Sequence, residues 1–147
     1  MVQTLLALVL VGTASITDLR TGRIPNALTL AGFTAGITLS AASGVLASSV
    51  LAAASGAGAL LAVRGLGHVL YRQPGMGWGD VKLAGALGAI VGWPVLWALF
   101  LAAVVGSIVG LALRFRQRPL AGEPTRVVFA PFIAVGWALT LWIPVPV

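Results

Sequence analysis

The chain has 147 residues, of which 59% are hydrophobic and only 8% are charged, against roughly 25% charged residues in an average soluble domain. A soluble fold of this length could not bury so many apolar side chains, whereas a bilayer accommodates about 20 of them in each helical crossing. The absence of cysteine excludes disulfides, thiolate zinc sites and cysteine nucleophiles. The formal charge of +6 comes from basic residues in short segments between apolar runs, which argues against a nucleic-acid partner. We therefore expect a membrane protein with a single domain over residues 1–147.

Six apolar stretches follow one another along the chain and predict six transmembrane helices. They run approximately from 2 to 17, 27 to 43, 45 to 63, 81 to 92, 93 to 113 and 127 to 143. The fourth stretch is short for a full crossing, and Pro94 either ends it or kinks a longer helix that continues into the fifth; we expect two separate helices. The predicted fold class is all-α, in a polytopic membrane protein.

The basic residues lie in or beside three of the five segments between these helices. The segments are "DLRTGRIPN", "RGLGHVLYRQPGMGWGD" and "RFRQRPLAGEPTR", and the other two segments carry no charge. With six helices the three basic segments fall on one side of the bilayer. Lys and Arg accumulate on the cytoplasmic side of membrane proteins. We therefore expect these segments in the cytoplasm and both chain ends outside (N-out/C-out), in the plasma or inner membrane.

Small residues recur within the predicted helices at a spacing of four. Glycines at this spacing let helix backbones approach closely in lipid; the pairs are Gly32 and Gly36, Gly88 and Gly92, and Gly106 and Gly110. We expect them to pack helices within one chain, although the same spacing would serve a homodimer.

Only three acidic residues are present, and two of them stand at helix ends. Asp18 closes the first predicted helix and Asp80 opens the fourth, so both are expected at the same membrane depth on the cytoplasmic side. Glu123, between a glycine and a proline in the most polar segment, is expected to be a solvated loop acid without a role. Ionisable groups at the edge of the hydrocarbon region are costly and are by default functional or paired.

Two accounts of the two aspartates remain open. In the structural account, Asp18 pairs with Arg20, Arg23 or Lys82, and Asp80 caps its helix, where an acid interacts favourably with the helix dipole. In the functional account, the two carboxyl groups approach each other and share a proton.

Such a pair is equipped for peptide hydrolysis by water. Two carboxylates at hydrogen-bonding distance do not both ionise easily, so one is held protonated while the other stays charged. The charged member then takes a proton from water and the protonated member donates to the scissile carbonyl oxygen. Glycines at 75, 77 and 79 suit this chemistry, because residues without a Cβ permit positive φ and close approach of an extended substrate. A dinucleotide-binding loop is disfavoured, because it requires a strand before the glycines rather than membrane helices on both sides.

Three motifs carry a family resemblance. The string "GMGWGDVKLAGALGAIVGW" resembles the GxGD signature of the type IV prepilin peptidases, and "TDLRTGRIPNALTL" resembles their other hallmark, an aspartate followed by an Ile-Pro-Asn that begins the next helix. Asp18 and Asp80 match the first and second catalytic aspartates of that family. "FAPFIAVG" resembles the family's Phe-Gly-Pro-Phe stretch with Ala130 in place of the common glycine, a departure expected to leave the catalytic pair untouched.

The resemblance implies an intramembrane aspartic endopeptidase with the fold of the GxGD proteases. Its substrates would be pilin, pseudopilin or flagellin precursors, cut at the cytoplasmic face after a short basic leader, with the substrate helix held in the lipid bilayer. Neither a cofactor nor a metal is implied, and the only histidine, His68, has no companion ligands nearby in sequence. The residues expected to bind substrate or shape the site are Gly77, Trp78, Gly79, Lys82, Pro25 and Asn26.

We also expect no methylation activity, and two alternative functions are open. Larger members of the family carry an N-terminal domain with paired CxxC motifs and also methylate the new N-terminus; this chain starts in its first helix without cysteine, which predicts peptidase activity without N-methylation. The main alternative is a small transporter or channel subunit in which Asp18 and Asp80 bind a cation or relay protons. Such a protein would place its acids nearer the bilayer midplane. An inactive scaffold for pilus assembly is the third hypothesis.

Overall fold

The computed structural model describes residues 1–72, 76–116 and 129–143, and over these residues the protein is built only of helices. There are six: α1 (Val2–Thr21), α2 (Asn26–Ala42), α3 (Leu46–Tyr71), α4 (Trp78–Val91), α5 (Pro94–Arg116) and α6 (Ala130–Thr140). The all-α prediction is therefore confirmed. Three of the helices, α1, α3 and α5, are long and apolar enough to cross a membrane, and α2 and α6 are shorter apolar helices.

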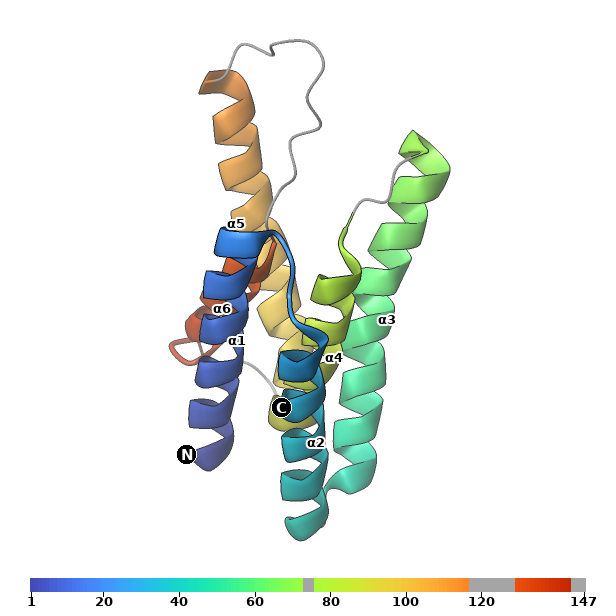
Figure 1. The fold of residues 1–147 in the computed structure, drawn as a ribbon, viewed down its shortest axis with the longest axis vertical. Coiled ribbons are helices and arrows are strands. Elements are labelled where there is room, and N and C mark those ends of the chain that lie inside the picture. The colour runs from blue at the N-terminus through green and yellow to red at the C-terminus, as the bar shows by residue number, and fades with distance from the viewer. Residues whose placement is uncertain (73–75, 117–128, 144–147) are drawn as a thin grey trace.

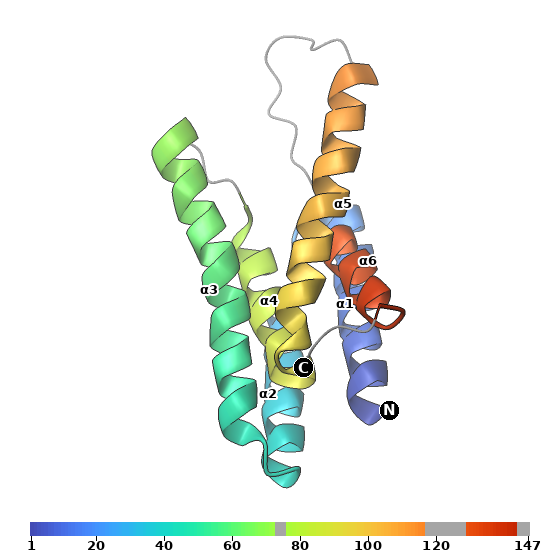
Figure 2. The same cartoon turned by 180° about the vertical axis from the view of Figure 1, so that it is seen from behind.

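Helix α4 lies at the centre of the bundle and touches each of the other five helices. In Figures 1 and 2, α3 lies on one side of it and α1 and α6 on the other, while α2 and α5 cover opposite faces. Apart from Lys82, every residue of α4 from Asp80 to Ile90 is buried. Its 14 residues span about 21 Å, less than the roughly 30 Å of a hydrocarbon core. A helix surrounded by protein does not need to match the bilayer, which explains why this segment is short and rich in glycine and alanine.

Glycines bring the backbones of α4 and its neighbours into direct contact. A Cβ on Gly36 of α2 would lie 2.7 Å from the backbone carbon of Ala89, and one on Gly88 of α4 would lie 2.7 Å from the backbone oxygen of Ala52 in α3. Real Cβ atoms do not tolerate such distances, so these helices pack closely only because glycine is present. Packing within one chain is thus confirmed for these two glycines.

The remaining glycines of the predicted pairs behave differently from one another. Gly32 packs against Leu10 of α1, and Gly106 is in ordinary contact with Phe132. Gly92 ends α4 with a φ of 71°, which favours glycine, and Gly110 has open space around it. The spacing of four therefore does not by itself identify a packing face.

Several helix boundaries differ from the sequence-based prediction. Helix α1 continues to Thr21 instead of ending at 17, so Asp18 lies inside its last turn. Helix α3 continues to Tyr71 instead of ending at 63, so Arg64 and His68 belong to a helix and not to a loop. Helices α4 and α5 are separate, as expected, with a turn at residues 92 and 93 between them.

The residues predicted to form the site lie at one end of the bundle. The last turn of α1 and the first turns of α2, α4 and α6 lie near one another at this end, and α3 and α5 extend beyond them (Figures 1 and 2). We call it the aspartate end, because it contains Asp18 and Asp80. Four residues with sequence-based predictions, Gly75, Arg118, Glu123 and Arg126, lie outside the described residues.

Candidate active site

Asp18 is held in the last turn of α1 by the way that helix ends. Gly22 adopts a left-handed conformation (φ 64°) and its backbone N–H donates to the backbone oxygen of Asp18 at 2.8 Å, a glycine-dependent helix cap. The Asp18 side chain is 8% exposed and turned into the protein. Its carboxyl group faces the backbone amide of Ala130 at the first turn of α6. Amide groups at a helix start have no partner within the helix and are well suited to a carboxylate.

Asp80 occupies the third position of α4 and folds back toward the start of that helix. Gly77, the residue before the helix, is extended (φ −72°, ψ 151°), and its backbone amide faces the Asp80 carboxyl group. A Cβ on Gly77 would lie only 3.1 Å from Asp80 Oδ2. The side chain is 7% exposed. Among the described residues its other oxygen, Oδ1, is buried and has no hydrogen-bond partner.

The structure brings the two aspartates into one buried site. Asp18 lies close enough to Asp80 for the two carboxyl groups to interact electrostatically, although the two residues belong to different helices and are 62 positions apart in the sequence (80 − 18 = 62). Within the described parts of the chain, no ion pair joins Asp18 to Arg20, Arg23 or Lys82, and the side chains of these three basic residues are exposed. The anchoring role that the structural account gives to Asp18 is therefore wrong.

The helix-capping role of Asp80 also needs correction. The residue at the cap position of α4 is Gly77, which provides no side chain, and Asp80 comes three residues later. An acid at this third position can still interact favourably with the helix dipole and with the amide at the cap. That interaction satisfies one carboxyl oxygen at most, because Oδ1 stays without a partner among the described residues.

The glycines before Asp80 serve the protein's own packing and not a positive φ. Gly77 is extended and Gly79 is helical, and neither has a positive φ. The space beside Gly77 is filled by the Asp80 carboxyl group, and a Cβ on Gly79 would lie 3.1 Å from the Cβ of Ile24 in the segment between α1 and α2. The expectation of a positive φ is therefore wrong for these two glycines, and their close approach to a substrate stays a prediction. They allow the aspartate-bearing turn to pack against the segment that follows Asp18.

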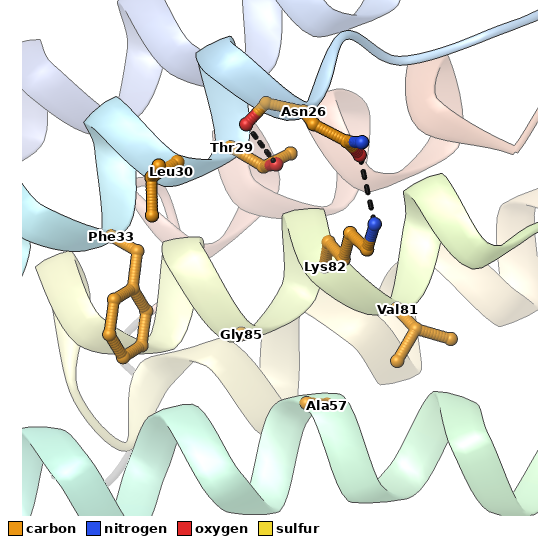
Figure 3. A pocket seen from close by; sticks show the side chains of 8 residues that line it. All are labelled: Asn26, Thr29, Leu30, Phe33, Ala57, Val81, Lys82 and Gly85. Carbon is orange, nitrogen blue, oxygen red and sulfur yellow. Dashed lines mark hydrogen bonds between the residues drawn. The ribbon is translucent and has the colours of Figure 1, made fainter.

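Lys82 and Asn26 form a contact of their own, next to Pro25. Pro25 precedes α2 and Asn26 is its first residue, and no side chain caps this helix. Asn26 Oδ1 instead accepts a hydrogen bond from Lys82 Nζ at 2.8 Å (Figure 3). Because Lys82 is two positions past Asp80, it points about 200° around the helix axis from that aspartate. Lys82 ties α4 to α2 on the side away from the aspartates.

Arg64 is a neighbour of the site that the sequence analysis missed. Its guanidinium donates to the backbone oxygen of Met76 and lies over the ring of Trp78, with Cζ 4.7 Å from the ring centroid. Arg64 thereby contacts two residues, Met76 and Trp78, of the short segment that precedes Asp80. The sequence did contain a sign of this role. Arg64 is the only Asp, Glu, Lys or Arg in α3, and a single charged residue in an apolar helix is by default functional or paired.

Ala130 also borders the site. It is fully buried, and its backbone faces Asp18. The Phe-Ala-Pro-Phe stretch that starts α6 is therefore part of the aspartate site and not remote from it. The described residues contain no group of three His, Cys, Asp or Glu side chains that could hold a metal ion.

Comparison with known proteins agrees with this arrangement. The model of the Type IV leader peptidase family matches residues 5–111. A prepilin leader peptidase/N-methyltransferase of Burkholderia pseudomallei is 38% identical over 135 residues, covering 90% of this chain and 43% of the relative. Proteins of the same name are 34% identical in Aeromonas salmonicida, with 85% of this chain and 44% of the relative covered, and in Escherichia coli, with 88% and 57% covered.

The similarity covers most of this chain but only part of each relative. The chain spans about half the length of the curated relatives that it matches, and no solved structure was found to match it. The family match covers well over half of the chain, including both Asp18 and Asp80. The chain belongs to the type IV leader peptidase family.

Proposed function

We propose that this protein is an aspartic endopeptidase that removes the leader peptide from type IV prepilin-like precursors. The observation that carries the proposal is the burial of Asp18 and Asp80 together at one end of the bundle, each beside the first turn of a helix. Family membership and the names of the relatives support the same activity. Pilin, pseudopilin and flagellin precursors are the substrate class that the resemblance suggests.

In the proposed mechanism, Asp18 and Asp80 act as one unit. A proton shared between the two carboxyl groups leaves one charged and one protonated, because two adjacent carboxylates ionise together only at high cost. The charged carboxylate accepts a proton from the attacking water while the other carboxyl donates a proton to the carbonyl oxygen of the scissile bond. The carboxyl that took the water proton then passes it to the amide nitrogen as the C–N bond breaks, and the proton on the former carbonyl oxygen returns to the other carboxylate. This collapse of the tetrahedral intermediate releases the leader with a new carboxyl end and a free amino group on the mature protein.

The first turn of α4 also suggests where the substrate docks. Gly77 and Gly79 leave room for Asp80 and Ile24 where a side chain would otherwise lie, so they contribute by shaping the turn. Trp78 lies between them and is 56% exposed, with its ring held under Arg64. We infer that substrate contact at this turn falls on the Trp78 ring. Arg64 already supplies positive charge here, so the basic leader of a precursor gains nothing from electrostatic attraction at this place.

The proposed membrane topology has six crossings, both chain ends outside and the aspartate end toward the cytoplasm. The basic segments of the sequence support it through the distribution of Lys and Arg. Because the chain has no cysteine, single cysteines introduced at Arg20 and at Gly44 would report the side directly. A membrane-impermeant thiol reagent applied to intact cells should label Gly44→Cys and not Arg20→Cys. The reverse labelling would contradict the topology.

Co-expression with a precursor tests the activity. A prepilin with a short basic leader before its apolar helix should be shortened in membranes that contain this protein and stay full length in membranes that lack it. Mass spectrometry of the product gives the position of the cut. An unmodified N-terminus agrees with the prediction of no N-methylation, and a product heavier by a methyl group refutes that prediction without affecting the peptidase proposal.

A further inference from the structure

A groove lies between α2, α3 and α4, apart from the aspartate pair. Its volume is about 490 Å³, and its walls include Leu30 and Phe33 of α2, Ala57 of α3 and Gly85 of α4 (Figure 3). Cavities of this size bind small organic ligands or a length of acyl chain. The groove opens on the side of α4 that carries Lys82, about 200° around the helix from Asp80, so it is distinct from the aspartate site.

The polar residues that line the groove, Asn26, Thr29 and Lys82, lie near the starts of α2 and α4, and we call this part of the groove its mouth. Lys82 Nζ donates to Asn26 Oδ1 at 2.8 Å, and no acidic side chain in the described part of the chain pairs with it. An ammonium group has three N–H donors, of which this contact uses one. Two donors of this lining residue are left for a group that enters the groove, which favours an anionic group at this place.

The rest of the groove is apolar and faces outward from the bundle. Leu30 is 64% exposed and Phe33 is 39% exposed, which is costly in water but not in lipid. From Asn26 to Phe33 the wall runs seven residues along α2, or about 10 Å, from the start of the helix toward its middle. A ligand that fits has an anionic head at the first turns of α2 and α4 and an apolar chain that follows α2 inward.

We propose that this groove binds one anionic phospholipid, with its phosphate on Lys82 and Asn26 and an acyl chain against Leu30 and Phe33. Charge complementarity at the mouth and the apolar walls below it select a membrane lipid over a soluble anion. A positive charge near the membrane surface attracts anionic lipids. The bound lipid bridges the first turns of α2 and α4. This proposal does not depend on the peptidase activity, and it is tested by lipid binding alone.

The experiment measures which lipid stays bound. Wild-type protein is reconstituted into phosphatidylcholine vesicles with a minor fraction of phosphatidylglycerol, extracted in mild detergent and analysed by native mass spectrometry. We expect one retained phosphatidylglycerol per chain and no comparable retention of phosphatidylcholine. Lys82→Gln should lower retention of phosphatidylglycerol about fivefold, the size expected for one lysine at an anionic membrane surface, and Lys82→Arg should preserve most of it.

Matched variants separate the groove from general charge and from folding. Arg20→Gln removes an exposed positive charge at the same end of the bundle and should leave retention unchanged. Ala57→Leu fills the groove and should abolish retention, and circular dichroism shows whether this variant folds. Phe33→Ala removes one exposed wall without adding bulk and should weaken retention. It replaces Ala57→Leu in the test if that variant does not fold. Millimolar inorganic phosphate should not displace the lipid, because phosphate lacks the acyl chain.

Three results would overturn the proposal. If Lys82→Gln retains as much phosphatidylglycerol as the wild type, Lys82 does not bind the headgroup. Equal losses in Lys82→Gln and Arg20→Gln reduce the effect to surface charge. Displacement of the lipid by inorganic phosphate alone, or by a leader-bearing precursor, assigns the groove to a soluble anion or to the substrate instead.

Discussion

The contact between Gly79 and Ile24 couples the two aspartate-bearing segments, and replacing the glycine by alanine tests that coupling. The added Cβ would lie 3.1 Å from Ile24 Cβ and 3.3 Å from Cγ1 and Cδ1, against about 3.5–4.0 Å for relaxed carbon contacts. Because the nearest atom is a Cβ fixed to the backbone, no rotamer change of Ile24 relieves the overlap. The first turn of α4 or the segment after Asp18 must move by roughly half an ångström.

The expected effect on catalysis is larger than the effect on stability. Alanine is better than glycine in a helix by about 1 kcal/mol, and overpacking costs about 1–3 kcal/mol, so the net loss in free energy of unfolding is about 0–2 kcal/mol. A displacement of 1 Å at a reacting group costs about a hundredfold in rate, so half that displacement predicts a kcat about tenfold lower. Initial cleavage rates at saturating precursor and unfolding in mixed detergent micelles measure the two quantities.

Gly58→Ala is the matched control. Gly58 is an exposed residue inside α3, and an added Cβ there meets nothing within 4 Å. It should gain up to about 1 kcal/mol of stability with unchanged activity. The reasoning is refuted if Gly79→Ala cleaves at the wild-type rate, or if Gly58→Ala loses as much activity as Gly79→Ala.

Three further predictions concern the anchor, the core and the pH profile. Arg64→Ala should lower kcat about tenfold by releasing Met76 and Trp78, with Arg64→Lys in between because it lacks the planar stacking group; Arg20→Ala should have no effect on the cleavage rate. Gly88→Ala places a Cβ 2.7 Å from the backbone of α3 and should lower the free energy of unfolding in detergent by about 3 kcal/mol, whereas Gly58→Ala should not lower it. The plot of kcat/KM against pH should be bell-shaped, falling where both aspartates are protonated and where both are charged; a rate that rises and then stays constant would contradict proton sharing.

The sequence predicted the helices well, because they depend on coarse properties, and the joint action of the two acids stays a prediction. Apolar stretches mark helices wherever the bilayer is the solvent, and six of them were found. Asp18 and Asp80 were expected at the same depth because one closes a helix and the other opens one. Their positions in the last turn of α1 and the first turn of α4 agree with that expectation.

The errors concern contacts between distant segments. Helix α3 was predicted to end before Arg64 because a charge suggests the membrane edge, but the Met76 carbonyl and the Trp78 ring accept that charge and the helix continues. Asn26 has the chemistry of a helix cap, yet its side chain meets Lys82, 56 positions away. The conformation of a glycine depends on what lies opposite, and the positive φ expected at Gly77 and Gly79 is absent because one is extended beside Asp80 and the other is helical against Ile24.

The central claim is that Asp18 and Asp80 together cleave the leader from a prepilin-like precursor. The most direct measurement is the mass of the precursor after co-expression with wild type, Asp18→Asn and Asp80→Asn, each quantified for expression and helix content. We predict leader loss with the wild type and an uncut precursor with either single variant at normal protein levels, because neither aspartate can replace the other. Cleavage by both single variants at the wild-type rate would contradict the aspartate-pair mechanism.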